Sequence, residues 1–167
     1  MTLTTRVETT IQATSVKTAD LSSPTDSLAY TKRIDLATGT GANQADLLFH
    51  DQRTLAASAT EDLDLAGTLT DQFGATITMA RIKGIVITAA VANTNNVNVT
   101  RPASNGVPIF LAAGDGVPVM PGGKFEWWSP NATGVAVTAG TADLITITNS
   151  AGSTSVTYDV VIVGASA

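Results

Sequence analysis

The sequence contains no cysteine, and this excludes disulfide bonds, thiolate metal ligands and cysteine nucleophiles together. Histidine occurs once, at His50, whereas zinc sites are normally built from several His and Cys ligands. Stability must therefore come from packing, hydrogen bonding or association with other chains. We expect neither a cofactor nor a metal ion.

Charge is also scarce. Charged residues make up 14% of the 167 residues, and the net charge is −5. Nucleic-acid-binding proteins normally carry a clustered basic patch, but the nine Lys and Arg residues here are scattered among acids. We therefore expect no nucleic-acid partner. Hydrophobic residues make up 44% of the chain, which predicts a folded protein with some apolar surface covered by a partner.

Long apolar runs are missing as well. The longest, residues 84–92, is far shorter than the roughly 20 residues that a membrane-spanning helix needs. The sequence opens with Met-Thr-Leu-Thr-Thr-Arg and stays polar, without the apolar segment of a secretory signal peptide. We expect no membrane partner and no secretion.

Residues that could perform catalysis are few. His50 and Asp51 are adjacent, and neighbours on an extended chain point to opposite faces, so they do not form an acid–base pair there. A group of carboxylates could form a glycosidase pair or a calcium site, but no calcium-loop pattern accompanies it, and solvated loop acids are the simpler interpretation. These carboxylates are Glu61, Asp62, Asp64 and Asp71. We predict a non-enzymatic protein with no catalytic residue.

Alternation of apolar and polar residues dominates residues 28–167. Seven or eight short strands follow one another at intervals typical of a sandwich or barrel, and no helical period competes. The first expected strand covers residues 28–36. A later one, beginning at Ile77, is expected to place Arg81, Lys83, Ile85 and Ile87 on one face. The pattern predicts an all-β fold with one β-sandwich or jelly-roll-like domain over 28–167.

Residues 1–27 have a different texture, rich in Thr, Ser and Asp with thinly spaced apolar residues. The spacing of Leu3, Val7 and Ile11 fits one face of a short helix, but the Thr and Ser residues between them are poor helix formers. We predict an extended N-terminal arm that becomes ordered on another subunit. Leu3, Val7 and Ile11 are then partner-binding residues.

The pair Trp127–Trp128 is the other candidate for partner binding. Neighbours on a strand face opposite sides, so one ring is expected to fill the core and the other to point outward. An outward tryptophan suits an interface between subunits, where aromatic residues are enriched. It could instead stack on a sugar, as in a carbohydrate-binding sandwich.

Four stretches resemble virion proteins of tailed bacteriophages: residues 45–56 (ADLLFHDQRTLA), 61–67 (EDLDLAG), 119–125 (VMPGGKF) and 158–164 (YDVVIVG). The resemblance implies a head decoration or cement protein, a homo-oligomer and commonly a trimer, that stabilises the capsid by bridging major capsid protein subunits. It places the protein on the capsid surface of the virion, after synthesis in the host cytoplasm. A tail or head–tail connector protein is the alternative within the same resemblance.

Overall fold

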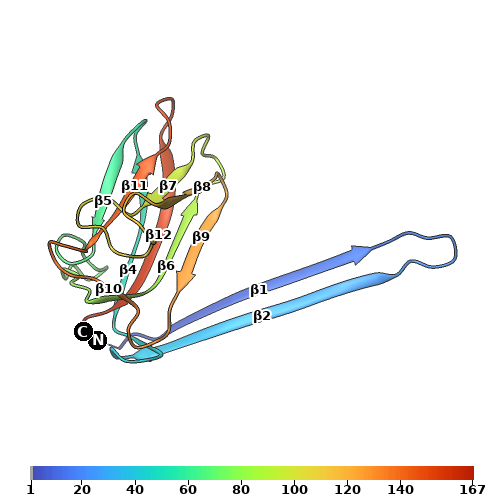
Figure 1. Cartoon of the computed structure of the whole chain (residues 1–167), viewed down its shortest axis with the longest axis horizontal. Helices are drawn as coiled ribbons and strands as arrows, with labels where there is room; N and C mark the ends of the chain where they lie inside the picture. The colour runs from blue at the N-terminus through green and yellow to red at the C-terminus, as the bar shows by residue number, and fades with distance from the viewer. Residues whose placement is uncertain (1) are drawn as a thin grey trace.

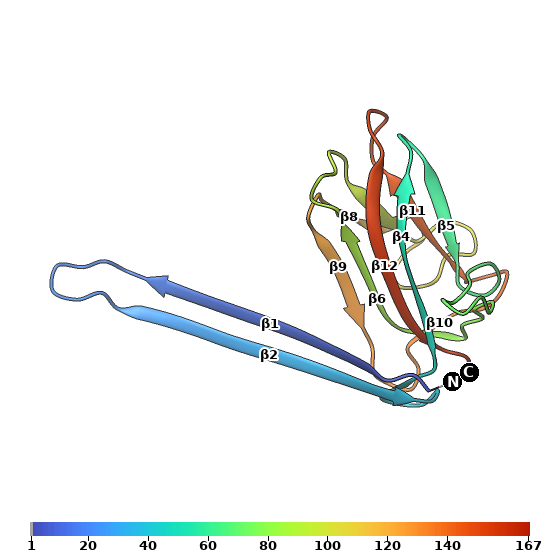
Figure 2. The same cartoon turned by 180° about the vertical axis from the view of Figure 1, so that it is seen from behind.

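A two-sheet β body and a long β-hairpin that projects from it make up the computed structural model, which describes residues 2–167 (Figures 1 and 2). The strands are β1 (Thr5–Val16), β2 (Thr25–Thr38), β3 (Gln44–Ala45), β4 (Leu47–Leu55), β5 (Thr60–Asp64), β6 (Arg81–Ala89), β7 (Val97–Thr100), β8 (Gly116–Val119), β9 (Lys124–Trp128), β10 (Val135–Ala136), β11 (Leu144–Asn149) and β12 (Val156–Ala165). The predicted all-β, sandwich-like fold is confirmed.

The body pairs its strands in the order of a jelly roll. One sheet runs β10-β6-β12-β4, with β9 also paired to β6, and the other runs β5-β11-β7-β8. All the strand pairs within these two sheets are antiparallel. The chain passes repeatedly from one sheet to the other, so strands from its two ends interleave in each sheet, as in double-sheet jelly rolls.

The main core lies between the two sheets and follows the period of two along each strand. In β11, Ile145 and Ile147 are buried, whereas Leu144, Thr146 and Thr148 on the opposite face are half-buried. A single apolar cluster joins both sheets and includes the aromatic residues Phe49 and Tyr158. The sandwich is therefore held by side-chain packing between its inner faces.

Strand β6 departs from the expected alternation. The strand begins at Arg81, and its inward residues are Ile82, Ile85 and Ile87. Against β12, Val163 pairs with Gly84 and Gly164 with Ile82, which leaves Lys83 as an extra, unpaired residue. This β-bulge shifts the parity of the strand by one position. The prediction that Arg81, Lys83, Ile85 and Ile87 share one face is therefore wrong.

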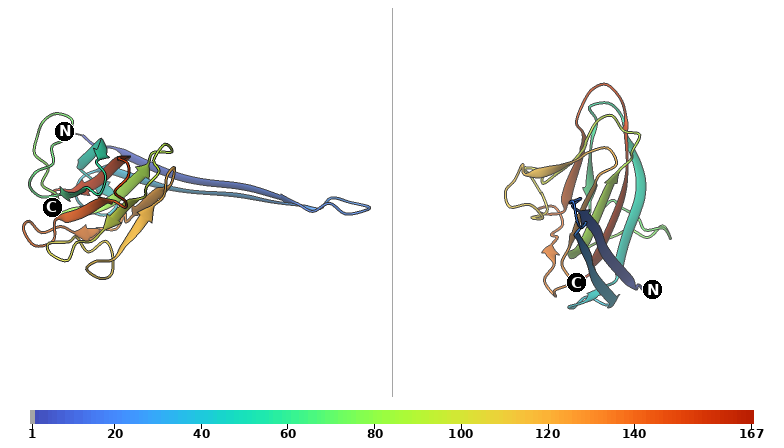
Figure 3. Two further views of the ribbon diagram at one scale, coloured as in Figure 1. Left: turned by 90° about the horizontal axis from the view of Figure 1, so that it is seen from above. Right: turned by 90° about the vertical axis from the view of Figure 1, so that its right-hand side faces the viewer.

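The N-terminal arm is a hairpin rather than a single extended segment. Strands β1 and β2 pair antiparallel over their whole length, from Thr5 opposite Leu36 to Val16 opposite Thr25, and residues 17–24 form the tip. Seen from above, the hairpin leaves the body at one end and extends away from it (Figure 3, left). The boundary expected between residues 27 and 28 falls within β2, because the strand expected over 28–36 pairs with β1 and not with the sandwich. The Thr-rich composition suits a strand, since β-branched residues favour strands.

Candidate interaction surface

The two faces of the hairpin differ in chemistry, and one of them is polar. On this polar face Arg6 Nε lies 3.0 Å from Asp35 Oδ1, and Arg33 Nε lies 2.6 Å from Asp35 Oδ2. Hydrogen bonds from Arg33 and Arg6 lower the pKa of the Asp35 carboxyl. Thr10 and Thr31 face each other across the strands at 3.4 Å between their hydroxyls. The polar face thus pairs much of its charge within the hairpin.

The opposite face, here called the apolar face, carries most of the hairpin's hydrophobic residues. By alternation and register it consists of Val7, Ile11 and Ala13 from β1 and Leu28, Tyr30, Ile34 and Leu36 from β2. Only the end near the body is covered: Leu36 is 1% exposed, whereas Ile11 is 50%, Leu28 52% and Tyr30 48% exposed. A two-stranded hairpin is only marginally stable by itself, and an exposed apolar patch of this kind marks an interaction site.

A second, smaller apolar cluster fixes the hairpin to the body, and we call it the root cluster. Its centre is Leu36 on β2, Ala45 on β3 and Val163 on β12, each almost completely buried. Around these residues pack Leu3, Ile34, Leu48, Trp128 and Val161. The root cluster makes the apolar face of the hairpin continuous with the outer face of the sheet that contains β4, β12, β6 and β9.

The two tryptophans lie on opposite sides of β9. Trp127 packs on the main core between the sheets, and Trp128 points outward onto the root cluster. The Trp128 indole nitrogen donates a hydrogen bond to Glu126 Oε1 at 2.8 Å. Its ring lies over Gly84, the residue that pairs with it on β6. The outward ring of Trp128 is half-buried against the root of the chain's own hairpin. The part of the ring that packs there is not available to a second subunit or to a sugar.

An open groove lies where the hairpin meets this outer sheet face. Its lining includes Leu3 and Val7 from the start of the chain, and Leu48, Val86, Trp128 and Val161 from the body. Four charged residues, Arg6, Glu8, Lys124 and Glu126, also line it, so the groove is an apolar corner with charged residues beside it. We call it the root groove.

Lys83, the bulge residue, ties the hairpin root to the body from within. Its side chain is fully buried, and its Nζ donates hydrogen bonds to the carbonyl oxygens of Gly41 (3.2 Å), Ala132 (3.0 Å) and Asn131. Burial and the neighbouring charge of Arg81 lower the pKa of the Lys83 amine. One ammonium group thus joins the loop that follows β2 to the loop that follows β9.

Replacing Lys83 with methionine is expected to lower the free energy of unfolding by about 2 kcal/mol, because carbonyl oxygens around a buried amine lose their donor. The loss should concentrate at the hairpin root. Hydrogen–deuterium exchange measured by mass spectrometry should therefore show faster exchange in residues 39–43 and 129–134 than in β11. Uniformly faster exchange across the body would contradict this role.

The structure brings the three predicted arm residues to one side of the molecule. Leu3 belongs to the root cluster, and its backbone nitrogen donates to Thr38 Oγ1 at 2.9 Å. Val7 and Ile11 lie on the apolar face, Val7 half-buried and Ile11 exposed. The reasoning from sequence missed Leu28 and Tyr30, which share this face, because it assigned them to the sandwich. The sequence signal for their shared face was the alternation of Leu28 and Tyr30 with Ala29 and Thr31.

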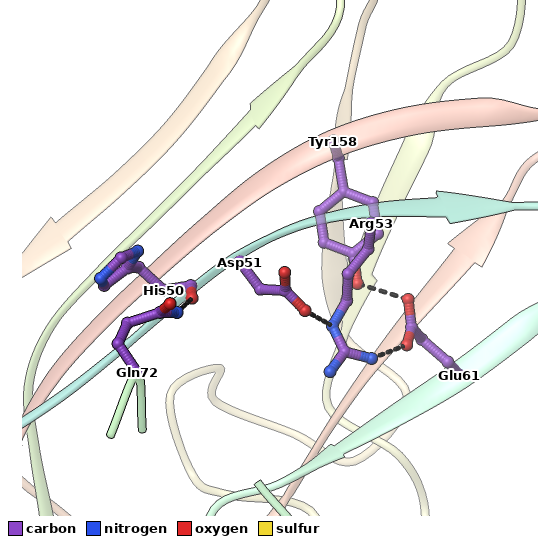
Figure 4. A network of polar contacts seen from close by, with 6 residues as sticks. All are labelled: His50, Asp51, Arg53, Glu61, Gln72 and Tyr158. Carbon is purple, nitrogen blue, oxygen red and sulfur yellow. Dashed lines mark hydrogen bonds and ion pairs between the residues drawn. The ribbon is translucent and has the colours of Figure 1, made fainter. Parts of the chain in front are cut away.

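His50 and Asp51 lie on opposite faces of β4, as Figure 4 shows. The carbonyl oxygen of His50 accepts a hydrogen bond from Gln72 Nε2 at 2.8 Å, and Asp51 lies 3.2 Å from Arg53 Nε. The side chains of His50 and Asp51 therefore do not form a catalytic pair.

The carboxylates near residue 60 have separate structural partners, and Glu61 is not a solvated loop acid. Glu61 lies on β5 and accepts hydrogen bonds from Tyr158 Oη and Arg53 Nη1, each at 2.6 Å (Figure 4). The Asp64 carboxylate accepts from the backbone nitrogen of Ala66. Asp62 and Asp71 also accept hydrogen bonds from nearby groups. The partly buried Glu61 network ties β4, β5 and β12 together.

Among residues 2–167 no three or more His, Asp or Glu side chains gather closely enough to hold a metal ion. The same residues include no helix of the length and apolarity needed to cross a membrane. The chain matches no protein-family model, no curated protein and no solved structure.

Proposed function

We propose that this chain is a structural protein of a tailed-bacteriophage virion, a head decoration protein that reinforces the shell by bridging major capsid protein subunits. The observation that carries the proposal is the projecting hairpin (Figure 1), whose apolar face is covered by nothing within residues 2–167 beyond its root. A two-stranded hairpin is only marginally stable by itself and an exposed apolar patch marks an interaction site, so the hairpin is suited to link neighbouring subunits.

The rest of the molecule supports a mechanical role. The body is a jelly-roll sandwich, an architecture that recurs in viral capsid proteins and lectins, although a fold alone does not establish a function. The root cluster and Lys83 fix the hairpin to this body through buried contacts. Force on the hairpin would therefore be passed to the sandwich rather than absorbed by a loose linker.

The hairpin gives the molecule a long reach. The twelve-residue β1 spans about 40 Å at the usual rise per residue of a strand. In the proposed arrangement the body sits on the shell and the hairpin reaches a neighbouring subunit. Many copies bound in this way act together, so that modest individual contacts give strong overall attachment.

Shell particles with and without the protein test the proposal. Particles that carry it are expected to withstand a higher temperature and a stronger osmotic shock before they release their contents. The matched variant shortens the hairpin by joining Thr9 to Lys32, which face each other in register, through an Asn-Gly turn. This variant should keep the unfolding midpoint of the body and lose the stabilisation of the particle.

Two results would count against the proposal. Equal resistance of particles with and without the protein would remove the stabilising role, and absence of the protein from purified particles would remove the virion assignment. The tail or connector alternative predicts far fewer copies per particle than a shell protein does, so quantitative staining of virions separates the two. For the carbohydrate alternative, a glycan array with intact protein and a Trp128→Ala variant is the corresponding test.

A further inference from the structure

We propose that the apolar face of the hairpin packs against the same face of a second copy of this chain, about a two-fold axis that crosses the Gln12–Ala29 cross-strand pair. This inference rests on the proposed function: each body sits on a major capsid protein subunit, and the paired hairpins of two copies of this chain join the two bodies. A self-complementary surface of this kind is what a two-fold interface requires.

The charges on the apolar face carry the first argument. Asp26 and Lys32 on β2 share this face with Leu28 and Tyr30, and neither takes part in an ion pair within residues 2–167. The polar face, in contrast, pairs Arg6 and Arg33 with Asp35 inside the hairpin. The two unpaired charges of the apolar face thus have opposite sign, and they lie on the surface that needs a cover; Glu8, on the polar face, is also outside these ion pairs.

Their spacing is symmetric about Ala29. Asp26 and Lys32 each lie three positions from Ala29, and Leu28 and Tyr30 each lie one position from it. The proposed two-fold axis lies between the two packed faces and runs across the strands at Ala29. It stacks β2 of one copy antiparallel on β2 of the other, about 10 Å apart as in packed sheets. Asp26 of each copy then faces Lys32 of the other, and Leu28 faces Tyr30.

The same axis arranges β1 consistently. Gln12 is the register partner of Ala29, so Ile11 and Ala13 lie symmetrically on β1. Each Ile11 then opposes the small Ala13 of the second copy, which lets a large side chain pack against a small one. Antiparallel overlap also places the two bodies at opposite ends of the paired hairpins, where they do not collide.

The overlap brings each hairpin tip to the other copy's root. A tip residue such as Leu21 lies as far from Ala29 on one side as the last residues of β2 lie on the other. Leu21 is fully exposed, and the root groove is open, with Leu3, Leu48 and Trp128 among its apolar lining residues. A ribbon about 40 Å long and 10 Å wide covers about 800 Å² in total, short of the roughly 1,200 Å² of stable specific interfaces. The tip in the groove supplies further area.

Sedimentation equilibrium of the full chain over a range of concentrations tests the pairing. The intact protein is expected to form a reversible dimer. Asp26→Lys or Lys32→Asp alone sets like charges against each other at two symmetric places, so the dimer dissociation constant should rise at least about tenfold. The double reversal, Asp26→Lys with Lys32→Asp, restores opposite charges and should return the constant to near its original value. Ser27→Lys, on the polar face, is the matched control and should leave it unchanged.

Leu21→Ser should also weaken the dimer, because it removes the apolar side chain placed over the root groove. A chain that stays monomeric at its highest soluble concentration would overturn the pairing, and so would a dimer whose strength ignores both charge reversals. Either result leaves the particle test of the proposed function intact. Conversely, if the protein dimerises as expected but never stabilises particles, the proposed function is overturned and the pairing stands.

Discussion

Replacing Gly84 with alanine is expected to lower the free energy of unfolding by about 3 kcal/mol, a large effect for one added methyl group. A Cβ on Gly84 would lie 1.9 Å from Cε3 and 2.1 Å from Cζ3 of Trp128. These distances are far inside van der Waals contact, so either the indole ring or strand β6 has to move.

Neither movement is easy. The Trp128 ring is held on its outer side by the root cluster and at its nitrogen by Glu126. Strand β6 lies between β12 and β9 and pairs with both. The strain should therefore spread into the hairpin root, where Trp128 touches the cluster of Leu36, Ala45 and Val163.

Chemical denaturation monitored by circular dichroism measures this loss. Gly152→Ala is the matched control, because its Cβ would have only the Ser58 hydroxyl within 4 Å, at 3.0 Å, and a small effect is expected. In a Trp128→Ala background, Gly84→Ala should cost much less than in the intact protein, which a double-mutant cycle reports as coupling. Equal costs in both backgrounds would show that the clash with Trp128 is not the cause.

Above pH 10 the protein is expected to lose about 1.4 kcal/mol of stability for each pH unit through Tyr158 alone. Burial, and then the hydrogen bond to Glu61, raise the pKa of the Tyr158 hydroxyl far above its ordinary value of 10.0. In the unfolded chain the phenol ionises near pH 10, whereas in the folded chain it stays neutral. The contribution of Tyr158 is therefore complete below pH 10 and is lost as the pH rises from there toward the raised pKa.

Unfolding free energies measured between pH 8 and pH 11.5 for the intact protein and for Tyr158→Phe test this expectation. The variant should be less stable at pH 8, because Glu61 loses a hydrogen bond at 2.6 Å, and its stability should fall less steeply above pH 10. Tyr30→Phe, compared at a protein concentration where the chain is monomeric, is the matched control, since it removes the chain's other tyrosine, which is exposed on the hairpin. Parallel profiles for the intact protein and Tyr158→Phe would contradict the assignment.

Local patterns in the sequence were sufficient for the fold class. In a strand such as residues 144–149, successive side chains point to opposite faces of the sheet. Alternation of buried and exposed residues is therefore visible in the local sequence. The same rule predicted that Trp127 and Trp128 point to opposite sides of β9. Composition rather than alternation placed Leu3, Val7 and Ile11 in an arm that lacks a core of its own.

Only the tertiary structure decided which strand pairs with which. Residues 28–36 read as a strand in the sequence, but pairing with β1 rather than with the sandwich depends on contacts across the tip of the hairpin. The bulge at Lys83 is one extra residue opposite β12, and it reverses the faces that alternation predicts. The contact between Glu61 and Tyr158 joins positions 97 residues apart. Such contacts form between distant segments, and no local period encodes them.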